Sequence, residues 1–375
     1  MLPYCLGFSH FLGIGPVRFQ ALVNAFGSPK KAYEASKDNL VNILGAKTGD
    51  RFDCFRRVFD PIKKLEEIKR KEISIVCFGD SSYPVLLKNI PDPPICLYVK
   101  GKPEAVNFEK KYFIAIVGTR RPTVYGQQIA RMFAAELSRL GFVVVSGMAI
   151  GIDTIIHQSV LNNNGQTIAI LGCGVDIIYP AINSYLYYSI IKNNGLVISE
   201  FPPGETVKPG LFIARNRIIS GLCRGAVVVE GQKDSGAMIT ARYAVNQGRE
   251  VFATPGPINS IMSEAPNILL KNGAKLVTSI NDILEELNIV ASPLPEEEKT
   301  ISLTDEEKKV IFLLKNKPML VDELTVKLGY PIEKIANSLS LLEIKGAVEK
   351  NEEGKYQIKL SHFASPNSAG YVRDN

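Results

Sequence analysis

Glycine and arginine follow an apolar run near the middle of the chain, in an arrangement that suits phosphate. Gly118, Thr119, Arg120 and Arg121 come directly after Phe113–Val117. Glycine allows close backbone approach, and arginine beside a helix N-terminus binds phosphate oxygens well. The spacing therefore predicts phosphate binding here, with ordinary surface arginines on a loop as the alternative.

A second small-residue loop, Ser146–Thr154, follows the next apolar run, Phe142–Val145. Two glycines, a hydroxyl and free backbone amides at a helix start would form an anion nest. The alternative is a glycine turn that only packs a helix onto a strand. The candidate anion-binding residues in this loop are Ser146, Gly147, Met148 and Asp153.

A third candidate is Arg215-Asn216-Arg217, with apolar residues on both sides. The two arginines point in different directions from a helix or strand. One can therefore bind phosphate, and the other can pair with a carboxylate in the core.

The sequence lacks the motifs that would indicate a nucleotide cofactor, a catalytic nucleophile or a bound metal. No G-x-G-x-x-G follows the first run, and no G-x-x-x-x-G-K-[ST] occurs, so neither a dinucleotide site nor a P-loop is predicted. His157 has no serine or cysteine placed to act with it. Six cysteines without C-x-x-C spacing and only three histidines argue against zinc and disulfides, and favour core thiols. We expect no enzyme, metal or cofactor.

The elements that would position these loops alternate between strand and helix. Six apolar runs predict strands buried on both faces: Phe113–Val117, Phe142–Val145, Thr167–Leu171, Leu196–Ser199, Ala226–Glu230 and Glu250–Thr254. A helix between Thr123 and Gly141 has a cap at each end. This alternation predicts an α/β fold with a Rossmann-like, doubly wound parallel sheet. The runs Ile73–Phe78 and Ile95–Lys100 should lead into it.

Composition shifts divide the chain. Residues 1–65 predict a helical domain, in which the turn Leu12–Arg18 is typical of a helix-hairpin-helix unit or simply closes an αα-hairpin. The core covers 70–288, a Pro/Glu linker 289–300, and a winged helix 301–360, with a capping box at Thr304 and Glu307. Residues 361–375 predict a flexible tail.

Charge and hydropathy limit the class of partner. The 375 residues carry a formal charge of +6, which permits a nucleic-acid partner without requiring one. No stretch approaches the roughly 18 apolar residues of a membrane span, and the first residues lack a basic signal-like segment. We expect a cytoplasmic protein without a membrane partner.

The ordered series GTR, VVSGMAIGID, TIAILGCGVDIIYP, LVISEFPPGE, ARNRIISGL, SGAMITA and QGREVFATPG resembles the DprA/Smf family over about residues 70–288. The resemblance implies an extended Rossmann fold that binds single-stranded DNA without strong sequence preference. It also implies protection of that DNA, loading of a RecA-type recombinase during natural transformation, and a homodimer. The implied DNA-binding residues are Gly118, Thr119, Arg120, Arg121, Ser146, Gly147, Met148, Asp153, Asn183, Arg215 and Asn216.

Two positions depart from the family pattern. Ile150 and Ala181 stand where many members carry a basic residue, which removes positive charge from the expected DNA pocket. Arg120, Arg121, Arg215 and Lys192 would then carry more of the phosphate contact. Tyr179 or Phe212 could offer a stacking face for bases, with core packing as the alternative.

Two alternative functions are a nucleotide hydrolase and a double-stranded DNA regulator. A nucleotide hydrolase of the lysine-decarboxylase-like type would need a P-G-G-x-G-T-x-x-E motif, which Glu230–Thr240 lacks. A double-stranded DNA regulator would read DNA through the winged helix. The third helix of that domain offers only Lys334 and Lys345, and the wing at 349–353 is largely acidic, which is poor for groove binding.

Overall fold

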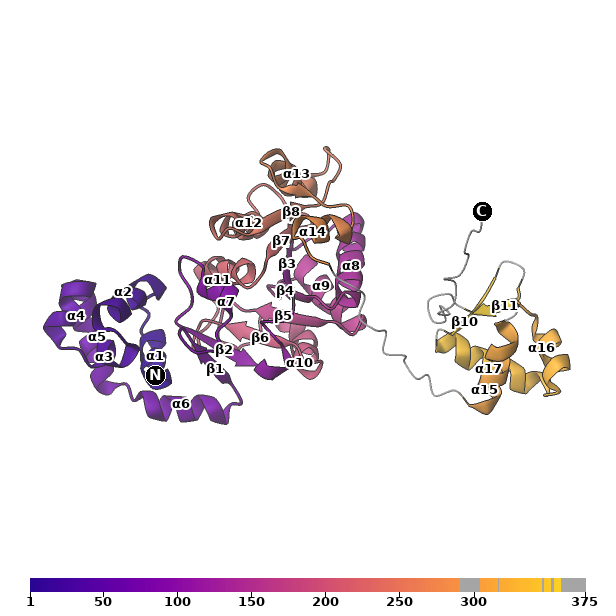
Figure 1. The fold of residues 1–375 in the computed structure, drawn as a ribbon, viewed down its shortest axis with the longest axis horizontal. Helices are drawn as coiled ribbons and strands as arrows, with labels where there is room; N and C mark the ends of the chain where they lie inside the picture. Colours follow the sequence, from indigo (N-terminus) through magenta and orange to yellow (C-terminus); the bar gives the residue numbers. More distant parts are fainter. Residues whose placement is uncertain (291–303, 316, 346, 352–353, 359–375) are drawn as a thin grey trace, which may run out of the picture. The chain divides into compact units, whose positions relative to one another are not determined.

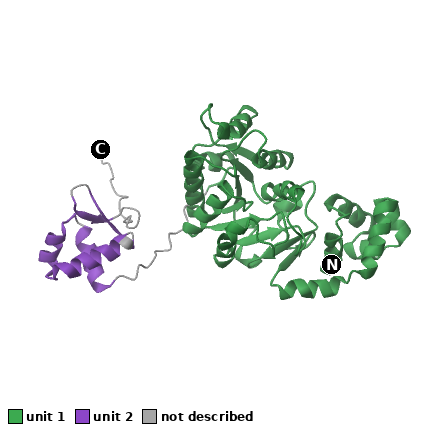
Figure 2. Ribbon diagram, turned by 180° about the vertical axis from the view of Figure 1, so that it is seen from behind, with its two compact units in different colours: residues 1–294 green, residues 295–375 purple. Residues whose placement is uncertain are grey.

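In the computed structural model, the placed residues are 1–290, 304–315, 317–345, 347–351 and 354–358. The chain divides into two units, residues 1–294 and residues 295–375 (Figure 2). Most of the predicted linker and the whole predicted tail, 361–375, lie outside the placed residues.

Within the placed residues, a nine-stranded sheet forms the centre of the first unit, in the order β1-β2-β6-β5-β4-β3-β7-β8-β9 (Figure 1). Its strands are β1 Ser74–Cys77, β2 Cys96–Lys100, β3 Phe113–Val117, β4 Val143–Ser146, β5 Gln166–Ile170, β6 Leu196–Ser199, β7 Gly225–Val228, β8 Glu250–Ala253 and β9 Lys275–Leu276. Strand β2 pairs antiparallel with both β1 and β6, and all other pairs are parallel. The predicted Rossmann-like α/β sheet is confirmed, with the two early runs as its antiparallel edge.

Both faces of the sheet are covered by helices, which explains why the strands are apolar throughout. Along β3, Phe113 and Ala115 belong to one core, whereas Ile114 and Ile116 belong to the other. The first face is covered by α7 Val85–Lys88, α11 Pro209–Gly221, α12 Gly236–Asn246 and α13 Glu264–Lys271. The second is covered by α8 Val124–Arg139, α9 Ile152–Asn162, α10 Ser184–Lys192 and α14 Ile280–Glu286.

Six helices precede the sheet: α1 Leu2–His10, α2 Pro16–Phe26, α3 Pro29–Glu34, α4 Lys37–Leu44, α5 Ala46–Val58 and α6 Pro61–Arg70. Their core, with Phe8 and Phe52 at its centre, also includes Tyr98 of β2. The helical region therefore shares a core with the edge of the sheet. In the turn between α1 and α2, Arg18 folds back to donate a hydrogen bond to the Gly13 carbonyl at 2.8 Å.

The second unit has the predicted winged-helix elements: α15 Asp305–Leu314, α16 Val321–Leu328, α17 Ile332–Ile344, β10 Val348–Lys350 and β11 Tyr356–Ile358. Strands β10 and β11 form an antiparallel pair. The predicted capping box is present, because Thr304 accepts a hydrogen bond from the Glu307 amide and the Glu307 carboxylate accepts one from the Thr304 amide.

Five of the six cysteines are buried thiols, as expected, but Cys54 is exposed because it lies on the outer face of α5. Among the placed helices, none has both the length and the apolar character that crossing a bilayer requires.

Candidate nucleic-acid interface

The carboxyl ends of β3, β4 and β5 lie next to one another, because these three strands are adjacent and parallel. Ligands of open parallel sheets bind at this edge. The loops after β3 and β4 touch there: the Ile152 amide donates to the Thr119 carbonyl at 3.1 Å. The two Gly-rich loops that the sequence analysis named therefore lie side by side at this edge of the sheet.

Gly151 makes this close approach possible. Its φ of +94° is a conformation that favours glycine, and a Cβ there would lie 2.4 Å from the Thr119 carbonyl oxygen. Any side chain at this position would push the two loops apart.

Arg120 and Arg121 are exposed on the loop after β3. Within the placed residues, neither guanidinium lies within 4.0 Å of a carboxylate, whereas Arg217 makes two ion pairs. Exposed, unneutralised arginines at a strand end are suited to phosphate.

The α8 N-terminus beside these arginines already has an anion of its own. Glu230 is buried, and its carboxylate accepts hydrogen bonds from the Thr123 amide at 2.9 Å and the Thr123 hydroxyl at 2.6 Å. Thr123 also caps the helix as predicted, by accepting from the Gly126 amide at 3.3 Å. This role of Glu230 was not identified from the sequence. The one feature that could have indicated it is the position of an acidic residue at the end of an apolar run.

Two amides of the predicted anion nest after β4 are likewise already hydrogen-bonded, so the expectation that these two are free was wrong. The Asp153 carboxylate accepts hydrogen bonds from the amides of Gly147 at 3.1 Å and Ala149 at 3.2 Å. Burial raises the pKa of Asp153, while nearby Arg215 and these amides favour its charged form. A side chain in the first turn of α9 thus takes the place predicted for a ligand.

Arg215 lies beneath the two loops and is buried. Its guanidinium donates to the carbonyls of Gly147, at 2.6 Å, and of Ile170, and to the Asn216 side chain at 3.1 Å. Burial, with a smaller contribution from the charge of Arg120, lowers the pKa of Arg215 to about 10 despite the opposing charge of Asp153. Arg215 therefore supplies positive electrostatic potential from beneath the loops, while its guanidinium donates hydrogen bonds to the Gly147 and Ile170 carbonyls.

Arg217 has the carboxylate role expected for one of this arginine pair. It is buried and pairs with Glu200 at 2.5 Å and with Asp92 at 3.0 Å. The prediction that one of the two arginines binds a core carboxylate is confirmed.

Most of the other predicted site residues are buried and shape the loops. Asn183 donates to the Met148 carbonyl and the Thr154 hydroxyl, both at 2.9 Å, and so ties the start of α10 to the loop after β4. Ser146 donates to the Ile116 carbonyl at 2.7 Å. Asn216 donates to the Gly236 carbonyl at 3.3 Å. Gly118 and Thr119 are half-buried.

Two aromatic rings lie next to Arg215. The ring centroids of Tyr179 and Phe212 are 5.4 Å apart, and the Arg215 guanidinium carbon is 6.0 Å from the Phe212 centroid. Tyr179 is 43% exposed and Phe212 is half-buried, so the pair presents part of its surface to solvent. Ile150 is 52% exposed, which leaves this region apolar where relatives are expected to be basic.

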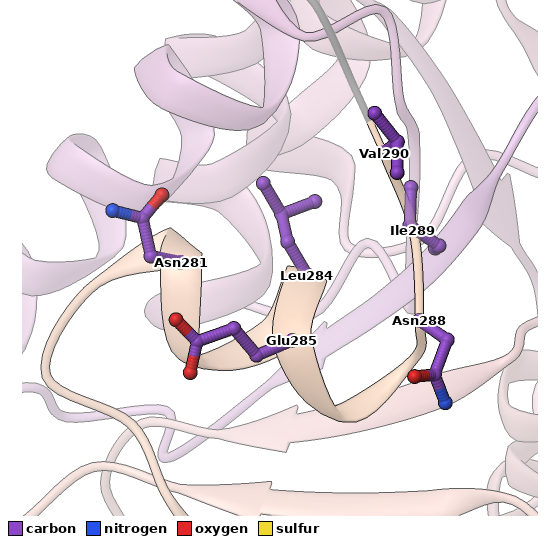
Figure 3. Close-up of a pocket in the computed structure, with 6 residues that line it drawn as sticks. All are labelled: Asn281, Leu284, Glu285, Asn288, Ile289 and Val290. Atoms are coloured by element: carbon purple, nitrogen blue, oxygen red, sulfur yellow. The ribbon is translucent and has the colours of Figure 1, made fainter.

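His157 packs into the core, as expected. Its Nδ1 hydrogen-bonds the Thr167 hydroxyl at 2.7 Å, and burial, followed by the charge of Arg215, lowers its pKa to about 3. A depression of about 460 Å³ elsewhere on the first unit is lined by Asn281, Leu284, Glu285, Asn288, Ile289 and Val290 (Figure 3). None of the predicted site residues lines it.

The chain matches the family described as DNA recombination-mediator protein A over residues 74–288, and the DprA winged helix domain over residues 294–354. The chain belongs to the DprA/Smf family. Protein Smf of Synechocystis is 32% identical, over 94% of this chain and 98% of its own length. DNA processing protein DprA of Streptococcus pneumoniae is 43% identical over 55% of this chain and 72% of its own length.

Two solved DprA structures are similar to the chain. The X-ray structure of the Streptococcus pneumoniae protein has a TM-score of 0.66 at 34% identity and covers 76% of this chain and 96% of its own. DNA processing protein A of Helicobacter pylori, solved to describe its single-stranded DNA binding mode, has a TM-score of 0.51 at 32% identity. It covers 58% of this chain and 96% of its own. Membership of the DprA/Smf family places the chain in DNA processing during recombination.

Proposed function

We propose that the chain binds single-stranded DNA at the carboxyl ends of β3, β4 and β5, without strong sequence preference. The observation that carries this proposal is the group of three arginine charges there, with Arg120 and Arg121 exposed above buried Arg215. Exposed guanidinium groups track phosphates, which carry no sequence information. The partly exposed pair Tyr179 and Phe212 supports base stacking beside them. The binding mode described for the Helicobacter pylori relative supports the same ligand.

The proposal extends to the wider role of the family. The chain would protect single-stranded DNA and help to load a RecA-type recombinase in the cytoplasm, as a homodimer and without catalysing a reaction. Light scattering of the full chain tests the dimer, and strand-exchange assays with a RecA-type recombinase test the loading.

The winged helix is the weaker candidate for the DNA site. Lys334 of α17 is engaged by Glu306 at 2.8 Å, and Lys345 by buried Glu307 at 2.7 Å. Cations already paired with carboxylates bind phosphate less strongly, because the pair must first be separated.

Fluorescence anisotropy with labelled oligonucleotides tests the proposal. The full chain should bind a single strand more tightly than a duplex of equal length, with similar affinities for different base compositions. Tighter duplex binding would favour the winged helix instead. Release of free base from nucleoside monophosphates would indicate a nucleotide hydrolase.

A further inference from the structure

Three cysteine thiols converge where α1 packs against the antiparallel edge of the sheet. Cys5 of α1, Cys77 of β1 and Cys96 of β2 are all buried. The sulfur atoms of Cys77 and Cys96 lie 3.1 Å apart, and the Cys5 thiol is close enough to that of Cys77 to interact with it. The DNA-binding proposal uses none of these residues.

The strand register suits a bond between Cys77 and Cys96. The two residues lie directly opposite each other in the β1–β2 pair. The Phe78 amide donates to the Ile95 carbonyl at 2.9 Å, which makes Cys77 and Cys96 a non-hydrogen-bonded pair. The Cα atoms of such pairs lie about 4.5 Å apart. A disulfide spans roughly 4.4–6.8 Å between Cα atoms, so the backbone need not move to form one.

We propose that Cys77 and Cys96 form an oxidisable dithiol that closes to a disulfide with a peroxide-class oxidant, and that Cys5 is its exchange partner. One thiol attacks a peroxide oxygen, which breaks the O–O bond, gives a sulfenic acid and releases water. The second thiol then attacks that sulfur, forms the S–S bond and releases a second water. Two thiols and one hydrogen peroxide thus yield one disulfide and two waters, with both electrons passing to the peroxide oxygens.

Cys5 gives the site a second state. Its thiol can attack Cys77 in the disulfide and release Cys96, which links α1 to β1 instead of β2. Burial raises the pKa of the Cys96 thiol, so the thiolate is scarce in the folded protein and oxidation should be slow.

The sequence makes the test direct. Trypsin places the three thiols in different peptides, residues 1–18, 72–88 and 89–100. The folded full chain is treated with hydrogen peroxide, its remaining thiols are alkylated, and the digest is analysed by mass spectrometry. We expect a cross-link between peptides 72–88 and 89–100, and a higher melting temperature, because the disulfide restrains the unfolded chain.

Cys54 and Cys223 provide the controls. Exposed Cys54 reports that the oxidant reached the protein, and the Cys223→Ser variant should still form the cross-link. Cys96→Ser should move the cross-link to peptides 1–18 and 72–88. Oxidation at Cys54 without any cross-link in the unmodified folded chain would overturn the proposal, as would a cross-link that forms only after denaturation. Neither outcome depends on whether a variant folds.

Discussion

At the scale of single residues, the exposed and the buried arginines of the proposed interface have different roles. Arg120 is exposed and can contact a phosphate directly. Arg215 instead donates hydrogen bonds to the Gly147 and Ile170 carbonyls, so it acts on a bound phosphate through its electrostatic potential. Asp153 holds the loop amides that a free anion would otherwise use. In the proposed interface, contact with phosphate would therefore depend on the exposed arginines of the loop after β3.

Arg120→Ala should weaken single-strand binding by about tenfold, the effect of losing roughly 1.4 kcal/mol of charged hydrogen bonding. The slope of log affinity against log salt should become shallower by about 0.7, because one phosphate contact is lost. Anisotropy titrations at several salt concentrations measure both quantities.

Arg139→Ala is the matched control, since Arg139 is exposed at the opposite end of α8. It should leave both affinity and salt slope unchanged. Equal losses in the two variants would mean that binding follows net charge and not this site.

His157 should make stability depend on pH. Its pKa is about 3 in the folded chain against about 6.5 unfolded, so the unfolded state binds more protons between these values. The free energy of unfolding is therefore unaffected above pH 6.5. It should fall by up to about 1.4 kcal/mol per pH unit below that.

Urea unfolding at pH 7 and pH 5 measures this change, and His157→Asn should reduce the difference between the two. His10, whose pKa burial lowers to about 4, contributes in the same direction and remains in the variant. An unchanged pH difference in His157→Asn would show that His157 is not held neutral by burial.

At the scale of elements, the start of α8 joins the site to β7. Thr123 caps the helix and also donates to Glu230, whose carboxylate is buried at the end of the neighbouring strand. The position of the Arg120 loop thus depends on a contact between residues more than 100 positions apart.

Thr123→Val should lower the free energy of unfolding by about 1 kcal/mol or more, because the cap is lost and the buried Glu230 loses a donor. Thr123→Ser keeps the hydroxyl and should lose much less. Urea unfolding of the two variants side by side makes the comparison, and equal losses would show that the Thr123 hydroxyl is not the source of the stabilisation.

At the scale of the whole molecule, the chain forms two units with separate hydrophobic cores. All the residues of the proposed interface belong to the first unit. Among the placed residues of the winged helix, Lys308 pairs with Asp305, Lys334 with Glu306, and Lys345 with Glu307.

A chain ending at residue 294 should remain folded and keep its affinity for single-stranded DNA within about twofold of the full chain, which is under 0.5 kcal/mol. Circular dichroism measures whether the truncated chain is folded, and fluorescence anisotropy measures its affinity for single-stranded DNA. A folded truncated chain that binds no single strand would assign DNA binding to the winged helix.

The sequence by itself determined the elements and their order. The runs Phe113–Val117 and Leu196–Ser199 were predicted to the residue, because a continuous apolar run is a local signal. The sequence also shows that each Gly-rich loop follows a predicted strand, and loops that follow adjacent parallel strands lie at one edge of the sheet.

Only the tertiary structure decided which groups at that edge are free. The Gly147 amide is not available to a ligand because it donates a hydrogen bond to the Asp153 carboxylate. Arg215 does not reach solvent because its part of α11 is buried. The alignment of Cys77 with Cys96 likewise needed the register of β1 on β2. Local sequence sets backbone conformation, but long-range packing sets burial and hydrogen-bond partners, and these determine which residues can meet a ligand.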